Sequence, residues 1–238
     1  MPAVLSFTAH ADPLTDPKRI LMRPRKVMNL DQDVHTVIVK ALVMRYSPLN
    51  GPKIAMATAR KHVPKQAVLQ WGHVQIAEGG DRMCCRAIIT PESLGRDCTY
   101  VRVCHFATIS LLSESDAAAH QQYEATVDWN ANSRNKQPDM MLQTFFGELQ
   151  RVVKINLPAT PQLKLREQQT LFYVIVKQCN AVQSREGFWE YRELGGLEAV
   201  DLGLVQSVVG QIFDQGKWVI IDRSRDRAHA DIDDSEPQ

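Results

Sequence analysis

Short runs of strand-forming residues, separated by turn residues, dominate the C-terminal third of this 238-residue sequence. β-Branched, aromatic and aliphatic side chains fill these runs, and such side chains favour β-strands. The turn Asp214-Gln215-Gly216-Lys217 is typical of a hairpin between two of them. The pattern predicts a β-rich module over residues 138–224, either a small β-barrel or a curved antiparallel sheet. Its strands are expected at residues 145–157, 170–179, 188–191, 205–213 and 218–222.

One run, residues 205–213, also fits a helix, because its apolar side chains recur at spacings of three and four residues. Gly203 and Gly210 disfavour a helix, and the run leads directly into a tight turn. A strand is therefore the preferred prediction for this run. Residues 170–179 are almost wholly apolar or β-branched, which indicates a central strand.

The N-terminal half predicts a helix and hairpin region over residues 30–137. Asn29 and Gln32 have the spacing of a capping box, and the helix that they begin ends before Pro48. A glycine-containing turn separates two strand-like runs, which predicts a hairpin. The expected elements are the hairpin at residues 67–76 and 82–90, a strand at 99–109, a second helix at 115–129 and a polar linker at 130–137. The fold class predicted is therefore α+β.

The net charge of +1 hides a basic start and an acidic end. Residues 1–66 carry eleven Lys and Arg against four Asp and Glu, and residues 184–238 carry six against twelve. Residues 1–29 predict a flexible basic arm, and residues 225–238 a disordered acidic tail. Mobile basic arms bind phosphate backbones without reading the sequence, although both ends could equally be solvated tails. The candidate phosphate-binding residues are Lys18, Arg19, Arg23, Arg25 and Lys26.

The five cysteines are an odd number, and their spacing does not resemble a disulfide framework. The chain has no recognisable signal peptide and no apolar run near the ~20 residues that span a bilayer. We therefore expect an intracellular protein with reduced thiols and no membrane partner. These features do not distinguish the cytosol from the nucleus, and it is the function expected below that favours the nucleus over the cytoplasm.

Motifs for catalysis are absent from the sequence. It contains no nucleophile elbow, zinc-protease motif, phosphate loop or dinucleotide fingerprint. The cysteines lack the paired spacing of a zinc site, and free buried cysteines behave as small apolar side chains. We expect no enzyme activity, no catalytic residues, no metal and no cofactor.

Aromatic side chains gather in the β-rich region and form a second candidate site. Aromatic faces can cage a methylated ammonium group or stack on bases, but aromatic residues also fill ordinary sheet cores. Phe188 and Trp189 are adjacent, so a regular strand cannot turn both inward, and one of them should be exposed. The candidate aromatic residues for peptide or base binding are Phe188, Trp189, Tyr191 and Trp218.

Four segments carry a resemblance to known proteins: AVLQWGHVQIAEGGD (67–81), RDCTYVRV (96–103), TFFGELQRVVKINLP (144–158) and the segment from FWEYREL to GKWVIIDRS (188–224). They resemble the non-catalytic C-terminal part of proteins encoded by fungal DNA transposons related to the CACTA type. The latter half also resembles the β-rich domain that closes plant CACTA-type transposases. The resemblance implies a small β-barrel similar to bromo-adjacent homology modules, which bind chromatin. The acidic triad of a transposase has no counterpart, so no catalytic residue is implied.

The expected function is a non-enzymatic, transposon-derived accessory module that binds DNA or chromatin. Its partners would be DNA, chromatin or another transposon-encoded protein. One alternative is a protein–protein scaffold that uses a β-sheet edge to receive a partner strand. The other is a degenerate fragment of the element with no selected function.

Overall fold

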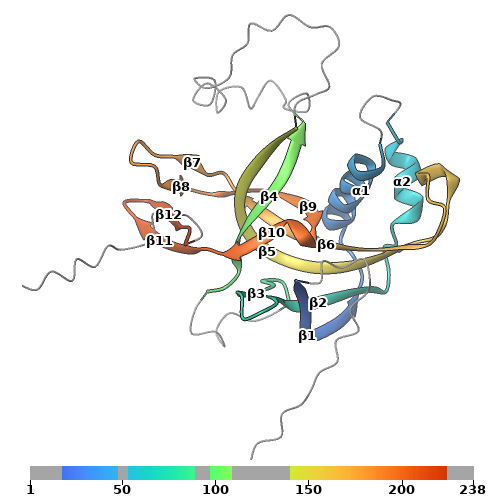
Figure 1. Ribbon diagram of the computed structural model, residues 1–238, viewed down its shortest axis with the longest axis horizontal. Helices are drawn as coiled ribbons and strands as arrows, with labels where there is room; N and C mark the ends of the chain where they lie inside the picture. The colour runs from blue at the N-terminus through green and yellow to red at the C-terminus, as the bar shows by residue number, and fades with distance from the viewer. Residues whose placement is uncertain (1–17, 48–52, 89–96, 109–139, 224–238) are drawn as a thin grey trace, which may run out of the picture.

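The computed structural model describes residues 18–47, 53–88, 97–108 and 140–223. These residues form an α+β fold in which helices pack against a curved, antiparallel main sheet, with a smaller sheet beside it (Figure 1). The predicted fold class is confirmed. Of the two forms expected from the sequence, the structure has the curved sheet, because the main sheet does not close into a barrel.

The main sheet is eight-stranded, and the smaller sheet is four-stranded with the order β11-β12-β8-β7. The main-sheet strands are β1 (Arg19–Met28), β2 (Val68–Ile76), β3 (Arg82–Cys84), β4 (Tyr100–Thr108), β5 (Met140–Leu157), β6 (Gln169–Cys179), β9 (Leu194–Asp201) and β10 (Val205–Val208). The smaller sheet contains β7 (Val182–Gln183), β8 (Trp189–Tyr191), β11 (Gly210–Asp214) and β12 (Lys217–Ile221). The helices are α1 (Gln32–Tyr46) and α2 (Met56–His62), with short 3-10 turns η5 (Pro161–Leu163) and η6 (Leu202–Leu204).

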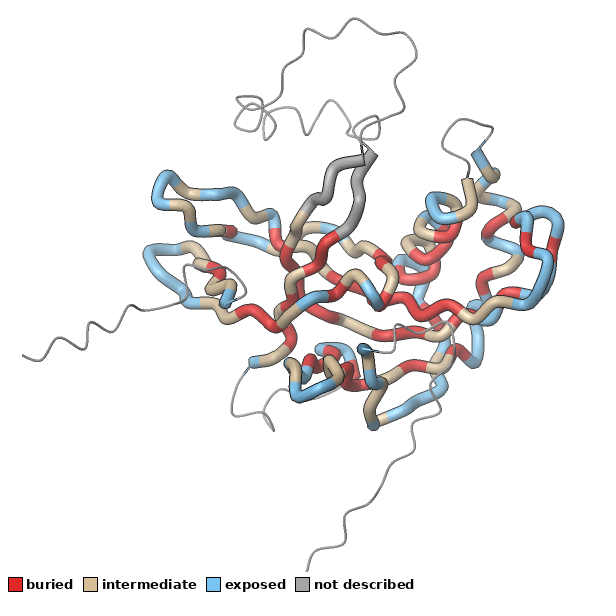
Figure 2. The backbone as a smooth tube through the Cα atoms, viewed as in Figure 1, coloured by how far each residue is buried: buried red, intermediate tan, exposed pale blue. Residues whose placement is uncertain are grey.

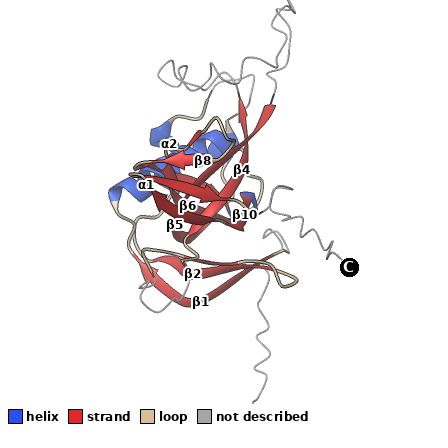
Figure 3. Cartoon of the chain, turned by 90° about the vertical axis from the view of Figure 1, so that its left-hand side faces the viewer, coloured by secondary structure: helices blue, strands red, loops and turns tan. Residues whose placement is uncertain are grey.

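Strand β5 organises the main sheet, because it pairs with β6 on one edge and with both β4 and β2 on the other. Its register against β6 shifts between Leu149 and Arg151. Beside this shift, Arg86 N donates to Leu149 O at 2.8 Å and Ala87 N donates to Gln150 O at 3.2 Å. Bulges bend a strand and increase its twist. The sheet accordingly curves here, and β1 and β2 lie apart from the helices, across β5 and β6 (Figures 1 and 3).

Helix α1 covers the outer face of β5, β6 and β9. Val34, Ile38 and Leu42 recur on one face of the helix and are buried against Ile155 and Ile175, among other residues of this core. Tyr46, on the last turn, donates its hydroxyl proton to Gln169 at the start of β6. The predicted helix is confirmed, whereas α2 was not predicted from the sequence.

The cap of α1 differs from the capping box that the sequence predicts. Asp31 is the N-cap, and its carboxylate accepts a hydrogen bond from Val34 N at 2.8 Å. Asn29 instead accepts from Ala67 N at 3.2 Å, next to the bond from Leu30 N to Lys65 O at 2.8 Å. Asn29 therefore ties the approach to the helix to the start of β2, and a carboxylate two residues later satisfies the first helical turn.

A second core lies on the face of the main sheet opposite the one that α1 covers. Apolar side chains of β2 to β6 and β10 meet there, and the buried stretch through the middle of the molecule follows β5 and β6 (Figure 2). Leu21 and Met28 of β1 pack against this core from the side. Strand β1 is thus a structural part of the sheet. The expectation of a flexible arm over residues 1–29 is wrong for Arg19–Met28, and residues 1–17 lie outside the described ranges.

The predicted hairpin at residues 214–217 is confirmed. β11 and β12 pair from Gly210 and Ile221 down to Asp214 and Lys217, which leaves Gln215 and Gly216 as a two-residue turn. Both residues have positive φ, 47° and 80°, as a type I′ turn requires. The strand prediction for residues 205–213 is also confirmed, but the run divides at Val209 between the main sheet and the smaller one.

The other predicted strands are also present, but the predicted regions of the chain do not fold separately. The hairpin of β2 and β3 and strands β4, β5, β6 and β8 are confirmed, and β6 is central, between β5 and β9. The main sheet draws strands from all of the regions 1–29, 30–137 and 138–224, because β5 pairs with β2 and β4. The predicted helix at 115–129, the linker at 130–137 and the acidic tail at 225–238 lie outside the described residues.

Candidate functional site

The five basic candidate residues lie on or next to β1. Lys18, Arg23, Arg25 and Lys26 are exposed. Arg19 is half-buried, and its Nε and Nη2 donate to Val205 O at 3.2 and 2.5 Å. Arg19 therefore links the first strand of the sheet to β10, and the other four side chains remain at the surface.

Strand β1 is an edge strand that holds these charges in a fixed register. Among the described residues it pairs only with β2, and it places Arg25 opposite Trp71 and Lys26 opposite Gln70. Thirteen Lys and Arg residues and four Asp and Glu residues occur between positions 18 and 88. The basic charge of the chain is thus concentrated on the part that contains β1, the helices and the β2–β3 hairpin.

His73 holds β1 against β2 where the β1 register shifts, between Met22 and Arg25. Its Nδ1 lies 2.5 Å from Arg23 O, and its Nε2 lies 3.1 Å from Arg82 Nη2. Arg82 can only donate, so Nε2 accepts and the Nδ1 proton is donated to Arg23 O. Burial lowers the pKa of His73, and Arg82 lowers it further against the effect of the Arg23 carbonyl. The imidazole is therefore a neutral structural link rather than part of the basic surface.

The four candidate aromatic residues do gather, on the smaller sheet. Tyr191 is buried, and the Trp189 ring lies 5.7 Å from the ring of Phe146, which projects from β5. Trp218 lies 5.0 Å from the ring of Phe213. Phe188 is 49% exposed. The prediction that one of Phe188 and Trp189 is exposed is confirmed, and the exposed one is Phe188.

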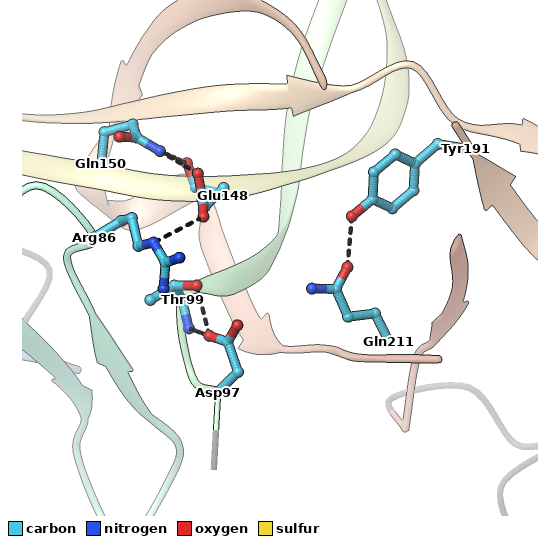
Figure 4. A network of polar contacts seen from close by, with 7 residues as sticks. All are labelled: Arg86, Asp97, Thr99, Glu148, Gln150, Tyr191 and Gln211. Atoms are coloured by element: carbon cyan, nitrogen blue, oxygen red, sulfur yellow. Dashed lines mark hydrogen bonds and ion pairs between the residues drawn. The ribbon is translucent and has the colours of Figure 1, made fainter. Parts of the chain in front are cut away.

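The inner face of the smaller sheet is a packing surface. Tyr191, Ile220 and Cys179 are buried in one cluster with Phe146 of the main sheet. Burial raises the pKa of Cys179 to about 12 and also raises the pKa of Tyr191, so both groups are neutral. The Tyr191 hydroxyl accordingly donates to the side-chain oxygen of Gln211 (Figure 4). Trp189 and Tyr191 hold the two sheets together and do not form an open cage.

The outer face of the smaller sheet is apolar and exposed. Strand pairing aligns Ile212, Val219, Glu190 and Val182 in one row across its four strands. Ile212 is 58% exposed and Val182 is 62% exposed. Lys217 and Glu190 form an ion pair on this face at 2.7 Å, and alternation along the strand places Phe188 on it as well. We call Val182, Phe188, Ile212 and Val219 the outer row.

Phe213 and Ile212 are exposed residues that the sequence prediction did not select. Phe213 is 59% exposed and lies at the tip of the β11–β12 hairpin. Apolar residues close to a two-residue turn have few neighbours to cover them, so their position within three residues of Gln215 was the available signal. Both side chains belong to the surface of the smaller sheet.

A polar network occupies the bend of β5 (Figure 4). Glu148 accepts from Gln150 Nε2 at 2.6 Å and forms an ion pair with Arg86 Nε at 3.4 Å. Asp97 accepts from the backbone and hydroxyl of Thr99 at 2.9 and 2.6 Å. Glu148 is buried, and these contacts compensate the loss of water around its carboxylate. The network therefore stabilises the bulge of β5 and the start of β4.

The described residues contain no group of three or more His, Cys, Asp or Glu side chains arranged to hold a metal ion. A shallow surface hollow beside η5 is lined by Ala159, Pro161, Lys164, Leu165 and Arg166. Within the same ranges, neither helix is long and apolar enough to cross a membrane. Comparison of the chain with protein-family models, with curated proteins and with solved structures gave no match.

Proposed function

We propose that this chain is a non-catalytic accessory module that binds the phosphate backbone of DNA, free or in chromatin, through β1. The observation that carries the proposal is the exposure of Arg25 and Lys26 on an edge strand whose register is fixed by β2. Cationic side chains on a fixed strand contact phosphate oxygens and position a protein on DNA without reading its bases. The transposon origin of the module is supported by the sequence resemblance alone.

The surroundings of β1 support contact with a polyanion. Lys65 is exposed, and its carbonyl oxygen accepts the hydrogen bond from Leu30 N just beyond the end of β1. Arg82, also exposed, lies on β3 on the far side of β2. These charges extend the basic surface beyond β1 at both ends, so a duplex could contact several of them together. Each neutralised phosphate contributes to affinity by releasing counterions.

The charge-reversal variant Arg25→Glu/Lys26→Glu should bind DNA about tenfold or more weakly at moderate salt, because two phosphate contacts become repulsive. The slope of log affinity against log salt should fall by roughly 2, one unit for each lost contact. Fluorescence anisotropy of labelled duplex and single-stranded DNA at several salt concentrations measures both quantities. Both side chains are exposed, so the melting temperature should stay within a few degrees of the wild-type value.

The matched control is Arg166→Glu/Arg185→Glu, which makes the same change of charge at two exposed positions outside β1. It should retain most of the wild-type affinity and the wild-type salt slope. Equal losses in the two double variants would show that net charge, and not β1, governs binding. Wild-type protein that does not bind DNA even at low salt would refute the proposal.

A second candidate function is a protein–protein scaffold, and the outer row specifically favours it. The row exposes apolar side chains on a sheet whose edge strands β7 and β11 each pair with a single described strand. An extended peptide could add to either edge by backbone hydrogen bonds and place its alternate side chains on the row. Such contacts would persist at high salt, unlike phosphate contacts.

Ile212→Lys should abolish recovery of protein partners at high salt while leaving DNA affinity unchanged, because it places a charge in the outer row. Affinity purification of tagged wild-type and variant chains, followed by mass spectrometry, measures the recovery. Arg25→Glu/Lys26→Glu is the reciprocal control and should retain those partners. Identical partner sets for wild type and Ile212→Lys would exclude the outer row as the binding surface.

A further inference from the structure

Two free cysteines meet at the junction between β3 and β4. The Sγ atoms of Cys84 and Cys98 are 2.6 Å apart, and Cys84 N donates to Cys98 O at 3.0 Å. Cys84 ends β3, and Cys98 precedes the first residue of β4 by two positions. Backbone pairing and thiol contact therefore juxtapose two residues that are fourteen positions apart in the sequence.

The other cysteines have different surroundings. Cys85 is buried in the core on the face of the main sheet opposite α1, and Cys179 is buried between the two sheets. Cys104 contacts the hydroxyl of Thr144 at 3.1 Å. Among the described residues, Cys84 and Cys98 are the two cysteines whose sulfur atoms are in contact.

We propose that Cys84 and Cys98 form a reversible redox site, which closes to a disulfide by exchange with a small disulfide such as oxidised glutathione. The inference goes beyond the proposed function and does not depend on it. The sequence spacing of the five cysteines indicates no disulfide framework, and only the fold brings this pair together.

The two thiols differ in access, which sets the order of the exchange. Cys84 is fully buried, whereas Cys98 is partly exposed. Burial raises the pKa of Cys84 to about 12, and the neighbouring Cys98 raises it too. A thiol with so high a pKa is a poor first nucleophile at neutral pH. Cys98 therefore attacks the small disulfide first, and Cys84 then displaces glutathione from the mixed disulfide on Cys98.

The exchange is balanced in two steps. The thiolate of Cys98 attacks one sulfur of oxidised glutathione, which forms a mixed disulfide and releases one glutathione thiolate. Cys84 Sγ then attacks Cys98 Sγ and passes its proton to the departing sulfur, which leaves as the second glutathione thiol. Two protein thiols are oxidised, one small disulfide is reduced to two thiols, and reduced glutathione in excess reverses the reaction.

A disulfide between Cys84 and Cys98 would add a covalent link between two groups of strands in the main sheet, β1–β2–β3 and β4–β10. Cys84 belongs to β3, which pairs with β2 and through it with β1, and Cys98 leads into β4. These two groups of strands are already joined through β5, which pairs with both β2 and β4, and by polar contacts from Arg19 to Val205 O and from Val208 N to Asp81 at 2.9 Å. Closing the ring from 84 to 98 should raise Tm by roughly 6–12 °C, if the loss of unfolded-chain entropy is expressed fully.

The test incubates the full chain with oxidised glutathione, blocks the remaining thiols with N-ethylmaleimide and measures intact and peptide masses. The expected product has lost two hydrogen atoms and yields a cross-linked peptide containing Cys84 and Cys98, which reduced glutathione reverses. A stable glutathione adduct without the cross-link would overturn the proposal. A cross-link between other cysteines, or no change in mass, would overturn it equally.

The variant Cys98→Ser should give no cross-link and no rise in Tm on oxidation, while its Tm under reducing conditions stays close to that of the reduced wild type. Cys104→Ser is the matched control and should retain the cross-link and the oxidation-dependent rise in Tm. A rise in Tm that persists in Cys98→Ser would contradict the assignment. The mapping on the wild-type chain remains decisive if either variant folds poorly.

Discussion

Replacing Phe146 by alanine should lower the free energy of unfolding by about 3–5 kcal/mol. Phe146 is 1% exposed and is the large main-sheet side chain, beside Cys179, in the cluster that packs the smaller sheet against the main one. Its ring contacts Trp189, and Tyr191 and Ile220 complete the same cluster. Truncation leaves a cavity between the two sheets. The sheets cannot easily move together to fill it, because β5 is held by its partners in the main sheet and β8 and β12 by theirs in the smaller one. Urea denaturation of wild type and variant measures the difference.

The loss of stability in Phe146→Ala should be greatest in the smaller sheet. In Phe146→Ala, hydrogen exchange should accelerate more for the amides of β8 and β12 than for those of β6, because the smaller sheet loses its packing contact with β5. Phe213→Ala is the matched control: Phe213 is 59% exposed, so its removal should change stability by only about 0.5 kcal/mol. Equal effects of the two substitutions would show that Phe146 does not join the sheets.

Replacing Gly147 by alanine should destabilise the protein by about 1–3 kcal/mol, although the added group is one methyl. A Cβ on Gly147 would lie 2.3 Å from Val176 Cγ1 and 2.7 Å from the backbone oxygen of Lys177. Gly147 lies inside the sheet, opposite Val101 of β4 and Gln178 of β6, so β5 cannot move away. Thermal or urea unfolding measures the cost.

Gly196→Ala provides the matched control, because a Cβ there meets nothing within 4 Å and the residue lies in β9 of the same sheet. It should be neutral or nearly so. Val176→Ala removes Cγ1, so the double variant Gly147→Ala/Val176→Ala should lose less stability than the two single changes added together. Part of the cost should remain, because the Lys177 oxygen stays in place. Strict additivity would contradict the clash with Val176.

The local elements that the sequence predicts correctly are those in which one short-range signal is sufficient. The periodicity of Val34, Ile38 and Leu42 predicts α1, and Gln215-Gly216 predicts the β11–β12 turn. Helix α2 was missed because it is only seven residues long and buries only Ala59 fully. Strand β1 was missed because prolines and charges hide an edge strand whose partner lies far along the sequence.

In the candidate sites, too, short-range patterns predicted some features correctly and missed those that depend on distant partners. The sequence correctly placed one of Phe188 and Trp189 at the surface, because adjacent strand residues face opposite sides. It did not indicate that Trp189 and Tyr191 pack against Phe146, since that contact depends on how the two sheets meet. It also grouped Arg19 with the surface charges, whereas its guanidinium bonds to Val205 across the fold.

By itself, the sequence determined the fold class, the positions of most strands, the main helix and the tight hairpin. These follow from side-chain periodicity and turn chemistry, which act over a few residues. Tertiary structure alone decided that β5 joins strands from separate parts of the chain, that β1 is fixed at an edge, and that Cys84 meets Cys98. Each of these is a pairing between distant residues, and only the burial of both faces of β5 and β6 selects it from the alternatives.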